Sequence, residues 1–282
     1  MTLPQPSLLL AVLTAVLGAC VGSFRSVVAW RLPRQESLLH PGSHCTHCGS
    51  PLRWWELLPL LSWLLQAGRC RRCAAPIGLR DPSVELLCSG LFVAALQGQP
   101  TPMQLALTPW LTPLAGWLLV AWLLPLLLVD LDHLWLPEPL CRWGLLCGLL
   151  VTALAGFEAS QAAGRAQLLH HLLAASAGLL GLEALSGLGQ ALLGKPALGL
   201  GDAKLAALLG AWLGLSGLGI SLGLAVLGGA VLGGAGLISG RLQRGQPLPF
   251  GPFLAGAGLA VWFSGNGFWL RLLGGLLGWG SF

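Results

Sequence analysis

The sequence contains little charge, and its acidic residues are scarcer than its basic ones. Only 9% of the 282 residues are charged, ten residues are aspartate or glutamate, 55% are hydrophobic, and the mean hydropathy is +0.77. This composition excludes a soluble globular protein and is typical of a protein that crosses a membrane several times. The net charge of +5 does not indicate nucleic-acid binding, because the basic residues are concentrated between apolar segments, where membrane topology accounts for them.

The apolar segments predict an all-α polytopic membrane protein with about eight transmembrane helices. A helix needs about 20 apolar residues to cross a bilayer. Runs of this kind lie near residues 6–28, 84–98, 110–129, 140–157, 168–189, 203–217, 219–239 and 252–280. No lysine or arginine precedes Arg25, whereas a signal peptide begins with a basic segment, so we expect the first run to be an uncleaved span.

Basic residues predict the orientation of the chain in the membrane. Seven of the 15 lie in the first polar loop: Arg31, Arg34, Arg53, Arg69, Arg71, Arg72 and Arg80. Because lysine and arginine are concentrated on the cytoplasmic side of membrane proteins, we expect this loop to be cytoplasmic. The expected regions are therefore a first transmembrane helix at 1–30, a cytoplasmic loop at 31–83 and a transmembrane domain at 84–282. His170 and His171 are expected at the opposite membrane interface.

Two of the few acidic residues lie at the ends of apolar runs, Asp130 in Val129-Asp130-Leu131-Asp132 and Asp202 in Gly199-Leu200-Gly201-Asp202. A carboxylate near membrane depth costs at least a few kcal/mol, so two of them indicate a functional role. The predicted topology places both at cytoplasmic helix ends, where they can meet. Such a pair would hold one proton between its members and act as an acid and a base.

The cytoplasmic loop contains two CxxC motifs separated by 21 residues. Their cysteines are Cys45, Cys48, Cys70 and Cys73. Four thiolates at this spacing are typical of a zinc ribbon, in which a structural metal holds together a loop too small to form its own core. Two disulfides are the alternative, but a cytoplasmic loop is kept reduced, which favours zinc.

Several segments, in order, resemble the bacterial type IV prepilin peptidases, which are membrane aspartic proteases of the GxGD class that also N-methylate their product. The matching segments are Gly22-Ser23-Phe24, Trp30-Arg31-Leu32-Pro33, the tetracysteine loop with residues 58–63 and 68–70, residues 80–87, residues 129–133 with Leu136-Pro137, residues 199–205 and residues 249–255. The GxGD motif alone also occurs in presenilin-like proteases. Its combination with two CxxC motifs is specific to the prepilin peptidases.

The resemblance implies a catalytic pair, Asp130 and Asp202. Residues expected around this pair are Asp132, Gly199, Gly201 and Lys204. Three positions depart from the family pattern: Glu138 stands where aspartate is usual, Ser26 where asparagine is common, and Pro196 where glutamate is frequent. The changes at Ser26 and Pro196 weaken the expectation of methyltransferase activity, for which the sequence shows no fingerprint.

The resemblance also implies partners and a location. The expected substrate is a prepilin or pseudopilin with a short basic leader, the methyl donor is S-adenosylmethionine, and residues 31–83 belong to the methyltransferase half. The lipid bilayer of the bacterial inner membrane surrounds the chain, with the active site on its cytoplasmic side. The alternatives are a presenilin-like or signal-peptide-peptidase-like intramembrane protease, and an ion-coupled transporter in which Glu183 would join the aspartates.

Overall fold

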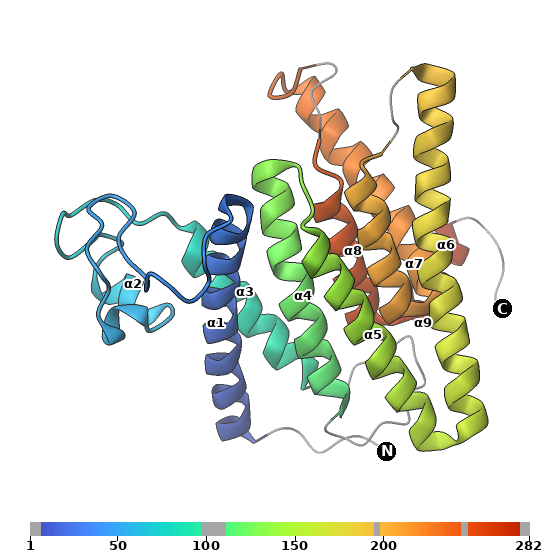
Figure 1. Ribbon diagram of the computed structural model, residues 1–282, viewed down its shortest axis with the longest axis horizontal. Coiled ribbons are helices and arrows are strands. Elements are labelled where there is room, and N and C mark those ends of the chain that lie inside the picture. Colours follow the sequence, from blue (N-terminus) through green and yellow to red (C-terminus); the bar gives the residue numbers. More distant parts are fainter. Residues whose placement is uncertain (1–6, 97–110, 195–197, 244–247, 277–282) are drawn as a thin grey trace. The chain divides into compact units, whose positions relative to one another are not determined.

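The structure, a computed structural model, describes residues 7–96, 111–194, 198–243 and 248–276 (Figure 1). Nearly all the regular secondary structure in these ranges is α-helix, and the β-pairing recorded there consists of two isolated bridges. The predicted all-α class is confirmed. The chain divides into two compact units, residues 1–97 and residues 98–282. The regions expected from the sequence, with boundaries after residues 30 and 83, stay a prediction.

The first unit consists of two helices and a long loop between them. Its elements are α1 (Leu8–Arg31), η1 (Leu32–Arg34), η2 (Trp54–Leu57), α2 (Leu61–Leu65) and α3 (Arg80–Ala95). Helices α1 and α3 pack closely through glycine: a Cβ atom on Gly22 would lie 2.9 Å from the Cβ of Cys88 and 3.0 Å from the Cα of Glu85. Small residues permit such close approach of helix backbones in membrane proteins.

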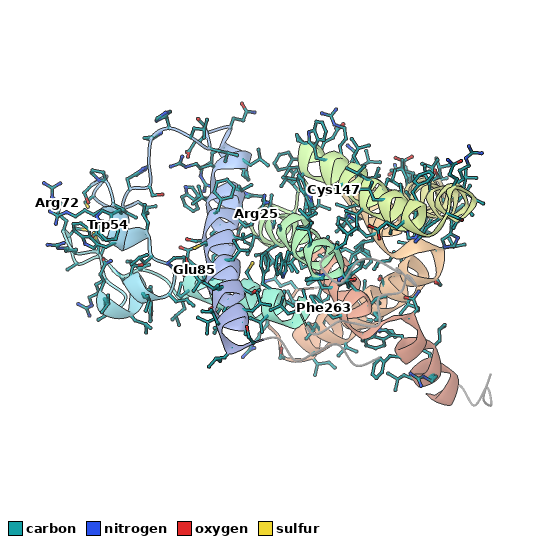
Figure 2. The ribbon with its side chains drawn as sticks, turned by 90° about the horizontal axis from the view of Figure 1, so that it is seen from below. Arg25, Trp54, Arg72, Glu85, Cys147 and Phe263 are labelled. Atoms are coloured by element: carbon teal, nitrogen blue, oxygen red, sulfur yellow. The ribbon has the colours of Figure 1, made fainter. Side chains whose placement is uncertain are left out.

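Hydrogen bonds anchor the loop to both helices. The guanidinium of Arg31, at the end of α1, is buried and donates to the carbonyl oxygens of Ser37 at 2.9 Å and Pro41 at 2.7 Å. The carboxylate of Glu85, in α3, accepts a hydrogen bond of 2.8 Å from the backbone N–H of Leu60. Figure 2 shows Glu85 on the loop side of α1, with Trp54 near the outer end of the loop. Polar contacts therefore tie the start of the loop to α1 and its middle to α3.

The second unit is a bundle of helices. Its elements are α4 (Leu111–His133), α5 (Glu138–Ala159), α6 (Gln161–Leu193), α7 (Leu200–Ile238), α8 (Gly251–Ser264) and α9 (Asn266–Leu276). Helix α7 packs against α5, α6 and α8. The rings of Trp212 and Trp262 are buried in this core with centroids 5.9 Å apart, and the indole N–H of Trp212 donates to the carbonyl oxygen of Gly144 at 2.9 Å. The core therefore surrounds the first half of α7.

Where the structure describes its residues, each predicted apolar run falls largely in helix, but the count of eight spans is not confirmed. Within the described ranges five helices are long and apolar enough to cross a membrane, and a sixth span results if α8 and α9, bent by 102°, form one. Two differences account for this. Helix α3 has 16 residues, fewer than a span needs, and the runs at 203–217 and 219–239 both fall in α7, whose two helical parts meet at a kink at Gly214.

Helix α7 is interrupted at Gly214, where φ is 68° and ψ is −176°, a conformation that favours glycine. The histidines of α6 bind the backbone there: Nδ1 of His171 donates to the carbonyl oxygen of Ala211 at 3.0 Å, and Nε2 of His170 accepts from the N–H of Leu215 at 3.4 Å. Unpaired backbone groups are costly inside a membrane. His171 is buried among the helices, and its expected position near the membrane interface stays a prediction.

Candidate active site and metal centre

Asp130 lies in the last turn of α4 with its side chain inside the second unit. Only 5% of the residue is exposed, and its Oδ2 accepts a hydrogen bond of 3.0 Å from the backbone N–H of Gly251, the first residue of α8. The approach requires glycine, because a Cβ atom on Gly251 would lie 2.6 Å from that oxygen. The start of α8 therefore fixes the orientation of the Asp130 carboxylate.

Asp202 lies in the first turn of α7. Its Oδ2 accepts a hydrogen bond of 3.2 Å from the backbone N–H of Gly199, so the GxGD segment forms the return half of a capping box at the start of the helix, glycine having no side chain to supply the other half. The preceding Gly201 packs against the segment that follows α4, since a Cβ atom there would lie 3.0 Å from the Cβ of Leu136. The sequence folds locally so that the GxGD turn lies against the exit of α4.

Asp130 and Asp202 lie close enough for their carboxylates to interact electrostatically. They come from two helices, α4 and α7; Asp130 is buried and Asp202 is half-buried. A pair of carboxylates in such surroundings cannot easily carry two negative charges, so it tends to hold one proton. The arrangement can therefore provide one acid and one base to a substrate placed between them.

Asp132 lies apart from this pair. It is exposed, whereas Asp130 is buried. Residues two apart on a helix point in directions about 200° from each other, so one turn of α4 cannot direct both carboxylates to the same place. Lys204 is held by an ion pair of 3.0 Å with Glu138, which joins α7 to α5. Both side chains are well exposed, so this ion pair contributes little to stability.

The role of Gly251 was not expected from the sequence. The segment Pro249-Phe250-Gly251-Pro252 matched the family pattern, but no chemistry was assigned to it. The signal available was a glycine between two prolines, a combination that places a rigid turn before a helix and leaves a backbone N–H accessible. The structure shows which side chain this N–H contacts, 121 residues earlier in the chain.

The four loop cysteines form a cluster in the first unit, built from two similar turns. In the first turn the N–H of Cys45 donates to Ser50 and the N–H of Gly49 donates to Cys45, and in the second the corresponding bonds join Cys70 with Ala75 and Ala74. An isolated β-bridge closes each turn. The two CxxC motifs therefore adopt the same local conformation and present their thiols to one point.

The geometry of the cluster suits a metal ion. All four Sγ atoms lie within 4.8 Å of one another, and those of Cys45 and Cys73 are 3.9 Å apart. Tetrahedral thiolates at 2.3 Å from a zinc ion would be separated by about 3.8 Å. All eight cysteines of the chain are free, so the disulfide alternative is not observed. Hydrogen bonding to Ser50 lowers the pKa of the Cys48 thiol to about 6, which favours the thiolate that metals bind.

The chain is similar to known families along most of its length. The family described as "Bacterial Peptidase A24 N-terminal domain" matches residues 16–97, and the "Type IV leader peptidase family" matches residues 117–238. The two matches fall in the two compact units, so the cysteine cluster lies in one and the aspartate pair in the other. Asp130 and Asp202 both lie within the second match.

Curated proteins similar to the chain carry the name prepilin leader peptidase/N-methyltransferase. One from Burkholderia pseudomallei is 36% identical over 92% of this chain and 87% of its own length. One from Aeromonas hydrophila is 40% identical over 85% of this chain and 73% of its own length. One from Myxococcus xanthus is 40% identical over 73% of this chain, which spans 56% of that relative. No solved structure matches the chain.

Proposed function

The chain belongs to the type IV leader peptidase family, and on that premise we propose that it cleaves the leader peptides of prepilins or pseudopilins and N-methylates the new N-terminus. The observation that carries the proposal is the pair of carboxylates, Asp130 and Asp202, which two helices bring within electrostatic range of each other. No described feature favours the transporter alternative, and Glu183 is exposed on α6.

Cleavage uses the two aspartates as a base and an acid. The ionised carboxylate takes a proton from a water molecule, whose oxygen attacks the scissile carbonyl carbon, while the protonated carboxylate donates its proton to the carbonyl oxygen. Breakdown of the tetrahedral intermediate then breaks the C–N bond, and the released amine takes up a proton. The hydrogen bond from Gly251 keeps the Asp130 carboxylate oriented through this exchange. No covalent intermediate with the enzyme is formed.

Methylation acts on the amine that cleavage releases. When bound, S-adenosylmethionine would supply the methyl group from its sulfonium, which would become a neutral thioether; the acceptor would be the lone pair of the unprotonated α-amine, which would then lose one proton. The names of the relatives support this second activity. The region associated with it is the loop at residues 31–83, and the peptidase domain is the region at 84–282.

Zinc is the metal proposed for Cys45, Cys48, Cys70 and Cys73. The fit of the sulfur separation to a tetrahedral site supports it, as does the closed set of four thiols, which leaves no position for a substrate. The ion would have a structural role, because the first unit has few buried apolar residues between Leu32 and Leu79. We assign it no step in either reaction.

The protein is proposed to lie in the bacterial inner membrane with its aspartates toward the cytoplasm. The concentration of basic residues in the loop at 31–83 supports this orientation. A prepilin leader is short and basic and precedes an apolar helix. That helix can lie in the bilayer while the junction with the leader reaches the aspartates at the membrane surface.

The assignment of the aspartates is tested with purified protein in detergent and a prepilin substrate. Asp130→Asn and Asp202→Asn should each reduce cleavage by at least about a thousandfold, because each removes one member of the acid–base pair. The exposed Asp132→Asn should retain most of the activity. Product mass measures cleavage, and a second mass shift of one methyl group with S-adenosylmethionine measures methylation. Persistent cleavage by Asp202→Asn would exclude the mechanism.

A further inference from the structure

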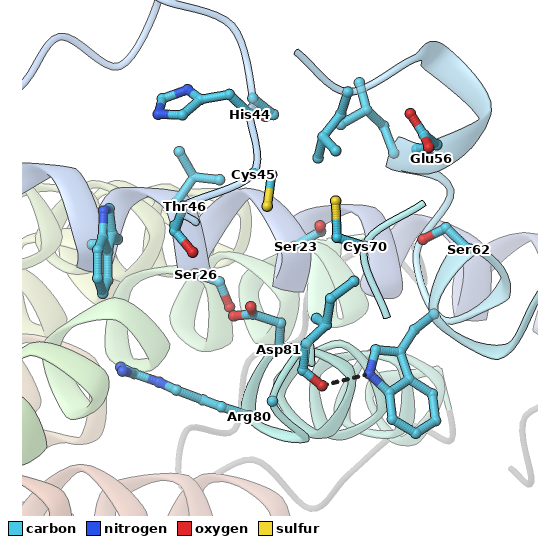
Figure 3. Close-up of a pocket in the computed structure, with 18 of the residues that line it drawn as sticks. Ser23, Ser26, His44, Cys45, Thr46, Glu56, Ser62, Cys70, Arg80 and Asp81 are labelled. Carbon is cyan, nitrogen blue, oxygen red and sulfur yellow. Dashed lines mark hydrogen bonds between the residues drawn. The ribbon is translucent and has the colours of Figure 1, made fainter. Parts of the chain in front are cut away.

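The first unit contains a cavity that the aspartate mechanism does not use. Its volume is about 440 Å³, and its wall is formed by α1, the loop and the start of α3 (Figure 3). Ligand pockets typically measure about 300–1,000 Å³, so the cavity is large enough for a small molecule. It lies entirely within residues 23–85 and can be described without reference to the second unit.

Acidic side chains are concentrated in this wall. Four of the ten acidic residues of the chain line it, namely Glu36, Glu56, Asp81 and Glu85. Two arginines, Arg31 and Arg80, also line it, which leaves a formal excess of two negative charges. The guanidinium of Arg31 already donates to backbone carbonyl oxygens of the loop. A cavity with this balance favours a ligand of positive charge.

Two tryptophans, Trp30 and Trp63, supply aromatic surface to the same wall. The indole N–H of Trp63 donates to the carbonyl oxygen of Ile77 at 3.2 Å, which fixes its ring, and the guanidinium of Arg34 lies 3.7 Å from the ring centre of Trp30. Indole rings bind purine bases by stacking and cationic groups through the face of the ring. The cavity thus combines surfaces for a planar base and for a positive charge.

Ser26 provides a polar atom that has no partner. Its Oγ is buried and makes no hydrogen bond within the described residues, although the residue lines the cavity. A buried hydroxyl without a partner costs about 1–3 kcal/mol, so such atoms commonly bind a ligand or water. Figure 3 shows Ser26 on the same side of the cavity as Asp81, facing Cys45 and Cys70.

We propose that this cavity binds S-adenosylmethionine, with Asp81 and the neighbouring acids facing its positive charge, a tryptophan against its adenine and Ser26 bonded to one of its polar groups. The proposal rests on the methylation proposed above and assigns it a place in the first unit. A hollow of about 270 Å³ between α6 and α7 in the second unit has only alanine, glycine and leucine in its wall, so it offers no group to a charged nucleoside.

The charge of the cavity also favours binding of the methyl donor over binding of the product that the donor becomes. S-adenosylmethionine carries a sulfonium, whereas S-adenosylhomocysteine, which remains after the methyl group leaves, is a neutral thioether. Acidic groups in the wall stabilise the first more than the second. The site therefore favours loading of the donor and release of the spent product.

The test measures binding to the full chain in detergent, without requiring turnover. The probes are S-adenosylmethionine and S-adenosylhomocysteine, and the variants are Asp81→Asn, Ser26→Val and the control Glu183→Gln, which removes the same charge from an exposed position on α6. Asp81→Asn should weaken binding of the sulfonium about tenfold and that of the thioether by less than about threefold. Ser26→Val should weaken both alike, and Glu183→Gln should change neither. A variant that still cleaves the leader peptide at the normal rate is correctly folded.

Photochemical crosslinking of radiolabelled S-adenosylmethionine to the wild type gives an independent result. The label should fall within residues 23–85. A label in the second unit, unchanged affinity in both cavity variants, or displacement of the probe by a synthetic basic leader peptide would overturn the site. If the wild type binds no S-adenosylmethionine at all, the methylation itself is contradicted, whereas binding that ignores the cavity variants contradicts only its location.

Discussion

The two units of this protein build their sites in opposite ways. In the second unit the aspartates lie at the ends of helices whose packed core includes Trp212 and Trp262, and backbone N–H groups hold each carboxylate. In the first unit the cysteines and the cavity wall belong largely to a loop with little hydrophobic core, held by Arg31, Glu85 and the cysteine cluster. Helix packing therefore positions one site, and polar contacts with the cysteine cluster position the other.

The largest expected effect is on metal content, which should depend on the cysteine cluster of the first unit and not on the packed core of the second. Cys45→Ser and Cys70→Ser should abolish metal binding, because three thiolates no longer close the site, and structural zinc contributes about 10–16 kcal/mol of apparent binding free energy. Elemental analysis should show the metal content falling from one ion per chain toward zero. Limited proteolysis should then cut the loop between the two CxxC motifs and leave the second unit intact.

Cys147→Ser is the matched control for this experiment. Cys147 is a free cysteine on α5, outside the cluster, so its loss should leave the metal content unchanged. Equal metal content in the wild type and in Cys45→Ser would contradict the tetracysteine site. If protease also cut the second unit of Cys45→Ser, the stability of that unit would depend on the metal, contrary to this prediction.

The second prediction concerns the aspartate site alone. Gly251→Ala places a methyl group 2.6 Å from Oδ2 of Asp130, so the carboxylate or the start of α8 must shift. We expect leader cleavage to fall by about 10- to 100-fold, since a misplacement of about 1 Å can have such an effect. Gly256→Ala, in the same helix with open space around the added methyl group, should leave the cleavage rate unchanged. Metal content should be unaltered in both variants.

The same comparison explains what the sequence could predict. Asp130, Asp202 and the four cysteines stood out because a scarce residue type occurred in a short, regular pattern, and the apolar runs located the helices. The contact of Gly251 with Asp130, the burial of His171 against Ala211 and the cavity around Ser26 depend on segments that only the tertiary fold brings together. The number of spans stays a prediction, because hydropathy alone does not show whether two adjacent apolar runs, such as those on either side of the break at Gly214, cross the membrane once or twice.

The smallest expected effect tests the loop at two equivalent backbone positions, one in each cysteine turn. Gly49 and Ala74 follow the first cysteine of each CxxC motif by four residues, and both have positive φ, 67° and 54°. Alanine is strained in this conformation and glycine is not, so Ala74→Gly should stabilise the loop and Gly49→Ala should destabilise it, each by about 1 kcal/mol. A Cβ atom on Gly49 meets no other atom within 4 Å, so the second effect reports backbone strain without a steric clash.

Competition with a metal chelator measures these differences, because loop stability and metal affinity are coupled. The chelator concentration that removes half the metal should rise for Ala74→Gly and fall for Gly49→Ala. Leader cleavage before metal removal should be equal in both variants, since neither residue belongs to the unit that holds the aspartates. Shifts of the same sign in both variants would show that the two turns are not equivalent, and the loop would then owe its shape to contacts other than the paired cysteine turns.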